Sequence, residues 1–302
     1  MSQRAIEKLL WYDAGRVVSS DKSLTTALRP LSAGELLDRT FSLYRSHFAV
    51  FLGIVAIPHL CVLAFQCLAL AFQSPGTPVS GFSRIFVWGL GASLLSIAVS
   101  AASHAATVIA VSEAHLGRPA GVMESFAKVR SRIAAVIGLS FSVGFLVILG
   151  CIALIVPGVL LAVRWSLAVP AMVLEDKGIG EAMSRSTELT VGNRGRIFVI
   201  WLLFLTLSLS FNWLLHWPIQ AAAGVGTRVA LHHAAVGWQI ASLVATFLSV
   251  CLVGPLATIA FSLVYFDERV RKEAFDLQLM MSSLDAPGLH SAPAQAGLRL
   301  SS

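Results

Sequence analysis

Residues 133–174 have the sequence IAAVIGLSFSVGFLVILGCIALIVPGVLLAVRWSLAVPAMVL, an apolar stretch whose only ionised side chain is Arg164. A helix needs about 20 apolar residues to cross the hydrocarbon core of a bilayer. This stretch is about twice that length, and Pro157-Gly158 removes a backbone donor and permits a turn. It therefore predicts a tight hairpin of two membrane spans, residues 133–155 and 158–174.

Four further apolar stretches lie on either side of this hairpin. They cover residues 48–72, 86–111, 197–219 and 237–266. Mean hydropathy is +0.78 and 13% of residues are charged, whereas a globular chain carries about 25% charged residues. Helices of soluble proteins are also shorter and amphipathic. We therefore predict an all-α integral membrane protein with six transmembrane helices.

The ends of the chain differ from its apolar middle. We assign residues 1–28 to a cytoplasmic N-terminal segment, 29–279 to the six-span membrane domain and 280–302 to a disordered cytoplasmic tail. No apolar core of a signal peptide precedes the first span. That span is therefore predicted to act as an uncleaved signal-anchor.

Basic residues fall almost wholly on one side of the six spans. Of the 22 Lys and Arg residues, only Arg84 and Arg228 lie on the opposite side, and Arg164 lies within a span. Positive residues stay on the cytoplasmic side during insertion, so both termini are predicted to be cytoplasmic.

The same basic excess suits certain partners. It matches a lipid bilayer with anionic inner-leaflet lipids, where each nearby cation gains about 1 kcal/mol, although the topology rule alone explains it equally well. Nucleic acid is not a predicted partner, because the basic pI follows from topology. A membrane-protein partner or a homo-oligomer stays open.

Three predicted cytoplasmic segments have a Glu followed four residues later by a base. The pairs are Glu35 and Arg39, Glu124 and Lys128, and Glu181 and Arg185. This order supports a helix by a few tenths of a kcal/mol, and each segment precedes a predicted hairpin. The pattern indicates three repeats of an interfacial amphipathic helix plus a helical hairpin. Unrelated interfacial helices produce the same pattern, so the repeat is one of two interpretations.

Five stretches carry a resemblance to a known family. They are Leu31–Arg45, Val156–Trp165, Val169–Glu175, Ala182–Ser186 and Tyr265–Glu273. Together they resemble a largely uncharacterised bacterial six-span membrane family related to the membrane domain of glycerophosphoryl diester phosphodiesterases. The resemblance implies a bacterial cytoplasmic (inner) membrane protein. It does not imply phosphodiesterase activity, because a catalytic barrel needs about 250 residues and only 36 follow the last predicted span.

Polar residues within the spans form a candidate intramembrane seam, made of Arg164, His59, His104 and Asn212. An ionisable residue at membrane depth is a functional hypothesis by default. The competing interpretation is structural. Arg164 would then extend to the interface beside Trp165, and the histidines would be hydrogen-bonded packing residues.

Catalytic, cofactor and metal sites are not predicted. All four cysteines lie within spans and are interpreted as packing residues without disulfides. His216, His232 and His233 are weak metal ligands because no carboxylate lies on their side. No Asp or Glu lies within a predicted span, which disfavours an intramembrane enzyme.

The sequence thus predicts a non-catalytic inner-membrane protein, a scaffold or assembly factor that presents cytoplasmic interfacial helices. The alternative is a small permease or lipid-handling protein that uses the polar seam.

Overall fold

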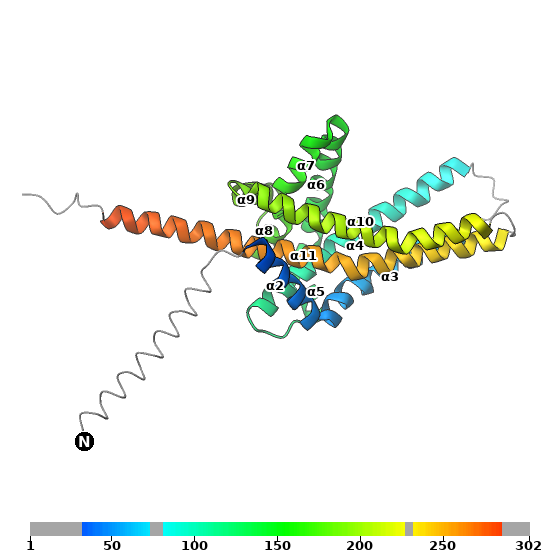
Figure 1. Ribbon diagram of the computed structural model, residues 1–302, viewed down its shortest axis with the longest axis horizontal. Coiled ribbons are helices and arrows are strands. Elements are labelled where there is room, and N and C mark those ends of the chain that lie inside the picture. Colours follow the sequence, from blue (N-terminus) through cyan, green and yellow to red (C-terminus); the bar gives the residue numbers. More distant parts are fainter. Residues whose placement is uncertain (1–31, 73–80, 227–231, 286–302) are drawn as a thin grey trace, which may run out of the picture. The chain divides into compact units, whose positions relative to one another are not determined.

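The computed structural model describes residues 32–72, 81–226 and 232–285, and within these ranges it contains helices and no strand (Figure 1). The elements are α2 (Ala33–Ser46), α3 (Phe48–Ala71), α4 (Gly81–His115), α5 (Val122–Val129), η1 (Arg130–Arg132), α6 (Ile133–Ala153), α7 (Ile155–Arg164), α8 (Ala168–Glu175), α9 (Ile179–Thr190), α10 (Arg194–Gly226) and α11 (His232–Asp285). The predicted N-terminal segment, 1–28, lies outside the described residues.

Six helical stretches are long and apolar enough to cross a membrane. They are Phe48–Ala71, Phe86–His115, Val122–Ala153, Ile155–Leu174, Arg194–Ala222 and Val236–Glu273. This confirms the prediction of helices with six stretches suited to cross a membrane, and it indicates a multi-pass membrane protein.

The chain divides into two compact units, residues 31–266 and residues 267–302 together with 1–30. In the smaller unit the described residues form the end of α11, which carries ion pairs one turn apart between Arg269 and Glu273 and between Asp267 and Arg271. The helix runs to Asp285, six residues into the segment predicted as a disordered tail. These pairs support this part of the helix, and no Pro or Gly lies between Asp267 and Asp285.

The α6–α7 hairpin turns at Leu154, which has an extended backbone (φ −164°, ψ 142°). The turn therefore comes three residues before Pro157, which lies in the first turn of α7, where its missing N–H leaves no intrahelical bond unmade. Gly158 instead allows α7 to pack closely against α6. A Cβ atom there would lie 2.6 Å from the backbone nitrogen of Cys151, so only glycine allows the two helices to approach this closely.

The predicted fourth span, 158–174, is two short helices rather than one. Helix α7 has ten residues and ends at Arg164, and α8 has eight and begins at Ala168. At 1.5 Å per residue each is about 12–15 Å long, roughly half of the hydrocarbon thickness. The helix is interrupted at residues 165–167, so backbone groups there and the side chain of Arg164 can form hydrogen bonds with another element.

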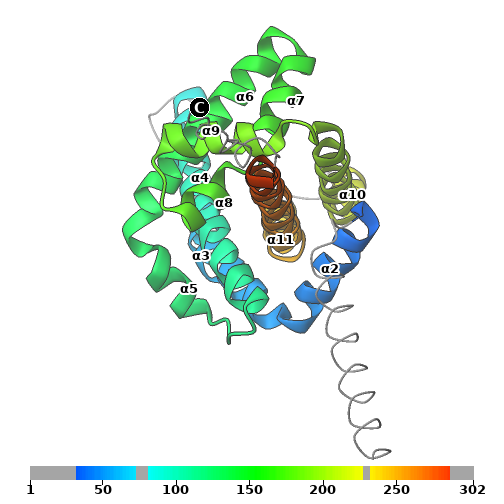
Figure 2. The ribbon, with the colours of Figure 1, turned by 90° about the vertical axis from the view of Figure 1, so that its left-hand side faces the viewer.

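Helix α11 up to Phe266 contributes the centre of the core. Figure 2 views it nearly along its axis, with α4, α8 and α10 around it. Ile259, Val264 and Tyr265 are fully buried there. The cluster around them also contains buried side chains from α2, α3, α4, α9 and α10. One helix thus organises the packing of segments far apart in the sequence.

The three short helices α2, α5 and α9 have similar N-terminal sequences. Each has a Glu at the third helical position, and two of these bond back to the cap: Glu35 accepts from the Ser32 N–H at 2.7 Å, and Glu181 accepts from the Gly178 N–H at 3.1 Å. Such caps satisfy donors that the first turn leaves open. The predicted glutamates therefore act at the helix start.

Two of the three bases in the predicted pairs have partners on other elements. Lys128 lies 2.9 Å from Glu113 of α4, and Arg185 bonds to Glu175 at the end of α8. The first and fifth residues after each Glu are buried. These residues are Leu36 and Thr40, Ser125 and Val129, and Ala182 and Ser186. The apolar faces of the three helices therefore pack on this chain.

Candidate functional site

A pocket of about 660 Å³ lies between α7 and the start of α10. Its lining consists of Ile155, Val156, Val159, Leu160, Leu161, Val163, Arg164, Arg194, Gly195 and Phe198. The volume falls within the range of about 300–1,000 Å³ that is typical of small-molecule sites. Only two of the lining residues are charged, and both are arginines.

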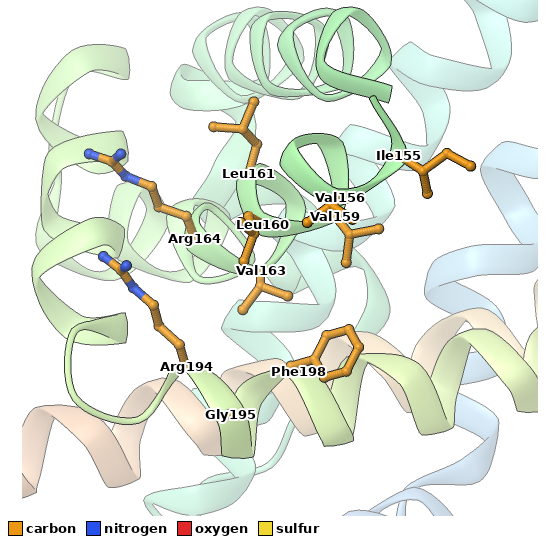
Figure 3. Close-up of a pocket in the computed structure, with 10 residues that line it drawn as sticks. All are labelled: Ile155, Val156, Val159, Leu160, Leu161, Val163, Arg164, Arg194, Gly195 and Phe198. Atoms are coloured by element: carbon orange, nitrogen blue, oxygen red, sulfur yellow. The ribbon is translucent and has the colours of Figure 1, made fainter. Parts of the chain in front are cut away.

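The pocket is polar at one end and apolar along the rest. Figure 3 shows the side chains of Arg164 and Arg194 side by side and pointing the same way, with Ile155, Val159 and Phe198 at the other end. Such a site matches an amphiphile: an anionic group at the guanidinium groups and an apolar body along the wall.

Arg164 is held in place by α9. Its Nε donates to Oγ1 of Thr187 at 2.9 Å, and the Thr187 hydroxyl donates in turn to the carbonyl of Met183 at 2.9 Å. The two terminal nitrogens of Arg164 have no partner among the described residues. Thr187 thus fixes the stem of the side chain and leaves its bidentate end free to bind a ligand.

Arg194 is the first residue of α10, and Gly195 follows it. The first turn of a helix leaves N–H groups without intrahelical acceptors and carries the positive end of the helix dipole. Gly195 lines the pocket and has open space where a Cβ would be, so side-chain bulk does not cover the backbone there. No Asp or Glu lines the pocket. Two arginines and a helix N-terminus therefore border one pocket whose lining contains no acid to neutralise them.

Ser186 closes the break between α7 and α8. Its hydroxyl donates to the carbonyl of Arg164 at 2.8 Å and accepts from the N–H of Leu167 at 3.2 Å. Ser186 is fully buried, so this one side chain satisfies two backbone groups that the broken helix leaves open. The bond also fixes the backbone from which Arg164 extends.

A separate ion-pair cluster, which we call the Glu175 joint, consists of Glu175, Lys177, Arg185 and Tyr265. The Tyr265 hydroxyl donates to Glu175 at 2.6 Å, and Arg185 Nε and Lys177 Nζ each lie 3.0 Å from the carboxylate. Partial burial raises the pKa of Glu175, but these hydrogen bonds outweigh it and lower the pKa to about 2. The joint therefore ties α8, α9 and α11 together through one carboxylate that three side chains contact.

Two of the predicted seam residues lie together in α3 and α4. His59 Nδ1 lies 2.8 Å from the carbonyl of Val55, which can only accept, so this nitrogen carries the proton. The other ring nitrogen lies 3.4 Å from the Ser100 hydroxyl, and His104 lies within electrostatic range of His59. His59 is buried, whereas His104 is exposed on the surface of the chain.

The other seam residues lie elsewhere. Arg164 contacts α9 and shares the pocket with Arg194, whereas Asn212 is half-buried in α10 and has no hydrogen-bond partner within the described ranges. His216 instead bonds to Thr246 at 3.1 Å. The predicted seam is therefore not one cluster: Arg164 lies at the break after α7 and contacts α9, whereas His59 and His104 lie in α3 and α4.

Sequence reasoning missed the partners that make the site. Arg194 counts in the sequence only as a topological cation, and nothing local marks Thr187. Glu175, Ser186 and Tyr265 do lie in stretches that carry the family resemblance, without a role attached. Among the described side chains, no three His, Cys, Asp or Glu residues gather as metal ligands. The side chains of His232 and His233 lie outside the described set.

Comparisons with known proteins locate the site within a recognised segment. Residues 120–266 match a family described as a domain of unknown function, DUF7847. No curated protein and no solved structure matches the chain. The matched segment runs from α5 to the membrane part of α11, and it contains both the pocket and the Glu175 joint.

Proposed function

We propose that this chain is a non-catalytic, lipid-handling protein of the bacterial cytoplasmic membrane that binds an anionic lipid between α7 and α10. The observation that carries the proposal is the pair Arg164 and Arg194 at one end of an apolar pocket without an acidic partner.

The chemistry of the two ends supports an amphiphilic ligand. Guanidinium groups bind phosphate oxygens bidentately, and such charge-assisted bonds are the strong ones. The apolar wall formed by α7 and Phe198 suits an acyl chain. The positive-inside distribution predicts that the start of α10 lies on the cytoplasmic side, where anionic lipids concentrate.

The same geometry supports a binding role over catalysis. Glu175 is the carboxylate nearest in sequence to Arg164, and it is engaged by three donors with its pKa held at about 2. A group so strongly stabilised in its charged form is poorly matched to proton transfer near neutral pH. The pocket lining itself offers neither an acid nor a nucleophile.

A scaffold or assembly factor is the second candidate. The α6–α7 hairpin exposes a long apolar face that includes Phe141, Phe145, Ile148 and Leu149, and in Figure 1 it stands upright while α10 and α11 run across the view. Such a face suits lipid, a membrane-protein partner or a second copy. The shared N-terminal glutamates and buried positions of α2, α5 and α9 support three repeats as the basis of this frame.

The test uses the full chain purified in mild detergent and examined by native mass spectrometry. The parent and an Arg130→Gln control should retain an anionic phospholipid, because Arg130 is exposed and lies outside the pocket. The Arg164→Gln/Arg194→Gln variant should retain about tenfold less or lower, since a hydrogen bond to a charged group contributes about 1.5–3 kcal/mol. Equal retention by the double variant would overturn the proposal.

A further inference from the structure

We infer that the headgroup bound by Arg164 and Arg194 is a phosphate monoester carried on a lipid, rather than a phosphodiester or a zwitterionic headgroup. This inference rests on the proposed function and names the ligand of the same pocket.

The first argument is the balance of charge. Arg164 and Arg194 bring two positive charges, the N-terminus of α10 adds a partial one, and no Asp or Glu lines the pocket. A phosphodiester brings one negative charge and leaves a guanidinium uncompensated. A zwitterionic headgroup brings its own ammonium next to two arginines. A phosphate monoester carries a charge of about −1.5 to −2 near neutral pH, because its second pKa is about 6, and so matches the pocket.

The second argument is the arrangement of donors. The stem of Arg164 is fixed by Thr187, which leaves both terminal nitrogens as donors. Arg194 supplies a second guanidinium, and Gly195 leaves the helix N-terminus uncovered. These donors come from α7 and α10 and lie side by side at one end of the pocket (Figure 3). A monoester offers three terminal oxygens to them, whereas a diester offers two.

The third argument is the wall that holds the tail. Val156, Val159, Leu160 and Phe198 give the pocket an apolar surface continuous with the exposed face of α7. A free phosphate or a soluble phosphate ester would leave this surface empty, and a lipid tail would cover it. Two lipid classes share the headgroup: a diacylglycerol phosphate and a polyprenyl phosphate.

The experiment is a lipid competition on the purified full chain, read by native mass spectrometry. Equal amounts of phosphatidic acid, a polyprenyl phosphate and phosphatidylglycerol are offered in phosphatidylcholine micelles. At least one monoester lipid should bind about tenfold more than phosphatidylglycerol, since one extra charge-assisted bond is worth about 1.5–3 kcal/mol. Arg130→Gln should keep this preference, and Arg164→Gln/Arg194→Gln should lose it.

A second readout varies pH. Binding of the monoester lipid should rise as the pH is raised through about 6, because the phosphate loses its second proton there, while phosphatidylglycerol binding should stay level. The monoester that binds better identifies the class of tail.

Two results would overturn the inference in distinguishable ways. If phosphatidylglycerol binds as well as both monoesters and the double variant loses all three, the headgroup assignment is wrong and the proposed function stands. If the double variant binds every lipid as the parent does and unfolds at the parental temperature, both the headgroup assignment and the proposed function are wrong. A single Arg194→Gln variant repeats the test with the Arg164–Thr187 bond intact.

Discussion

The Glu175 joint and the two-arginine pocket lie on neighbouring elements and use the same kinds of side chain in opposite ways. In the joint, Arg185 and Lys177 meet a carboxylate that also accepts from a tyrosine. In the pocket, Arg164 and Arg194 meet apolar side chains and no acid. The basic side chains of the joint thus contact a carboxylate of this chain. The two arginines of the pocket have no acid among the lining residues.

That difference separates a group that holds the fold from a group available to a ligand. Removing one member of a buried ion pair leaves the remaining charge uncompensated, which is costly. Removing an exposed cation that has no ionic partner among the described residues costs little, since water solvates what remains. We therefore expect mutations in the joint to change the free energy of unfolding strongly, and mutations of the two pocket arginines to change it little.

The largest expected effect comes from Glu175→Gln. This change removes the carboxylate that Arg185 and Lys177 share, although Arg185 keeps its longer ion pair with Glu188. Because the cluster is partly buried, the free energy of unfolding should fall by about 3 kcal/mol, the low end of the range for breaking a buried pair. Thermal unfolding in detergent measures it. Tyr265→Phe is the matched control, because it removes one hydrogen bond and keeps the charges, for about 1 kcal/mol. A Glu175→Gln protein that melts with the parent would mean that the joint does not hold the fold.

The pH dependence of stability is the second way to test the joint. The folded pKa of Glu175 lies near 2, below its ordinary value of 4.5. The unfolded chain therefore binds a proton between these values that the folded chain does not. The joint's contribution should be complete above pH 4.5 and be lost as pH falls toward 2, by at most about 3 kcal/mol. The parent and Glu175→Gln should accordingly converge in stability at low pH; a constant difference between them would contradict this assignment.

The smallest effect on stability is expected from Arg164→Gln/Arg194→Gln. Both side chains are exposed, so the free energy of unfolding should change by less than about 0.5 kcal/mol. Added anionic lipid should raise the unfolding temperature of the parent and leave the double variant unchanged, because only a ligand that binds the folded state stabilises it. Destabilisation as large as that of Glu175→Gln would make the pocket a second structural joint and remove the contrast.

Much of the membrane architecture could be predicted from the sequence because it depends on local composition. The apolar stretches predicted at 48–72 and 86–111 correspond to candidate spans at Phe48–Ala71 and Phe86–His115, since about 20 consecutive apolar residues are sufficient for a span. The exact turn was not predictable. Pro157-Gly158 marks the hairpin, but the chain turns at Leu154 because proline fits the first turn of the next helix.

The sequence by itself thus determined a helical chain with six apolar stretches, and it singled out Arg164 as the one charge among them. Only the tertiary structure decided what that charge does. Arg194 and Thr187 lie 30 and 23 residues further along the chain, and nothing in local periodicity joins them to Arg164. The break between α7 and α8, closed by Ser186, brings them together. Helix spans follow from how each segment partitions between water and lipid, whereas a site follows from which segments pack against one another.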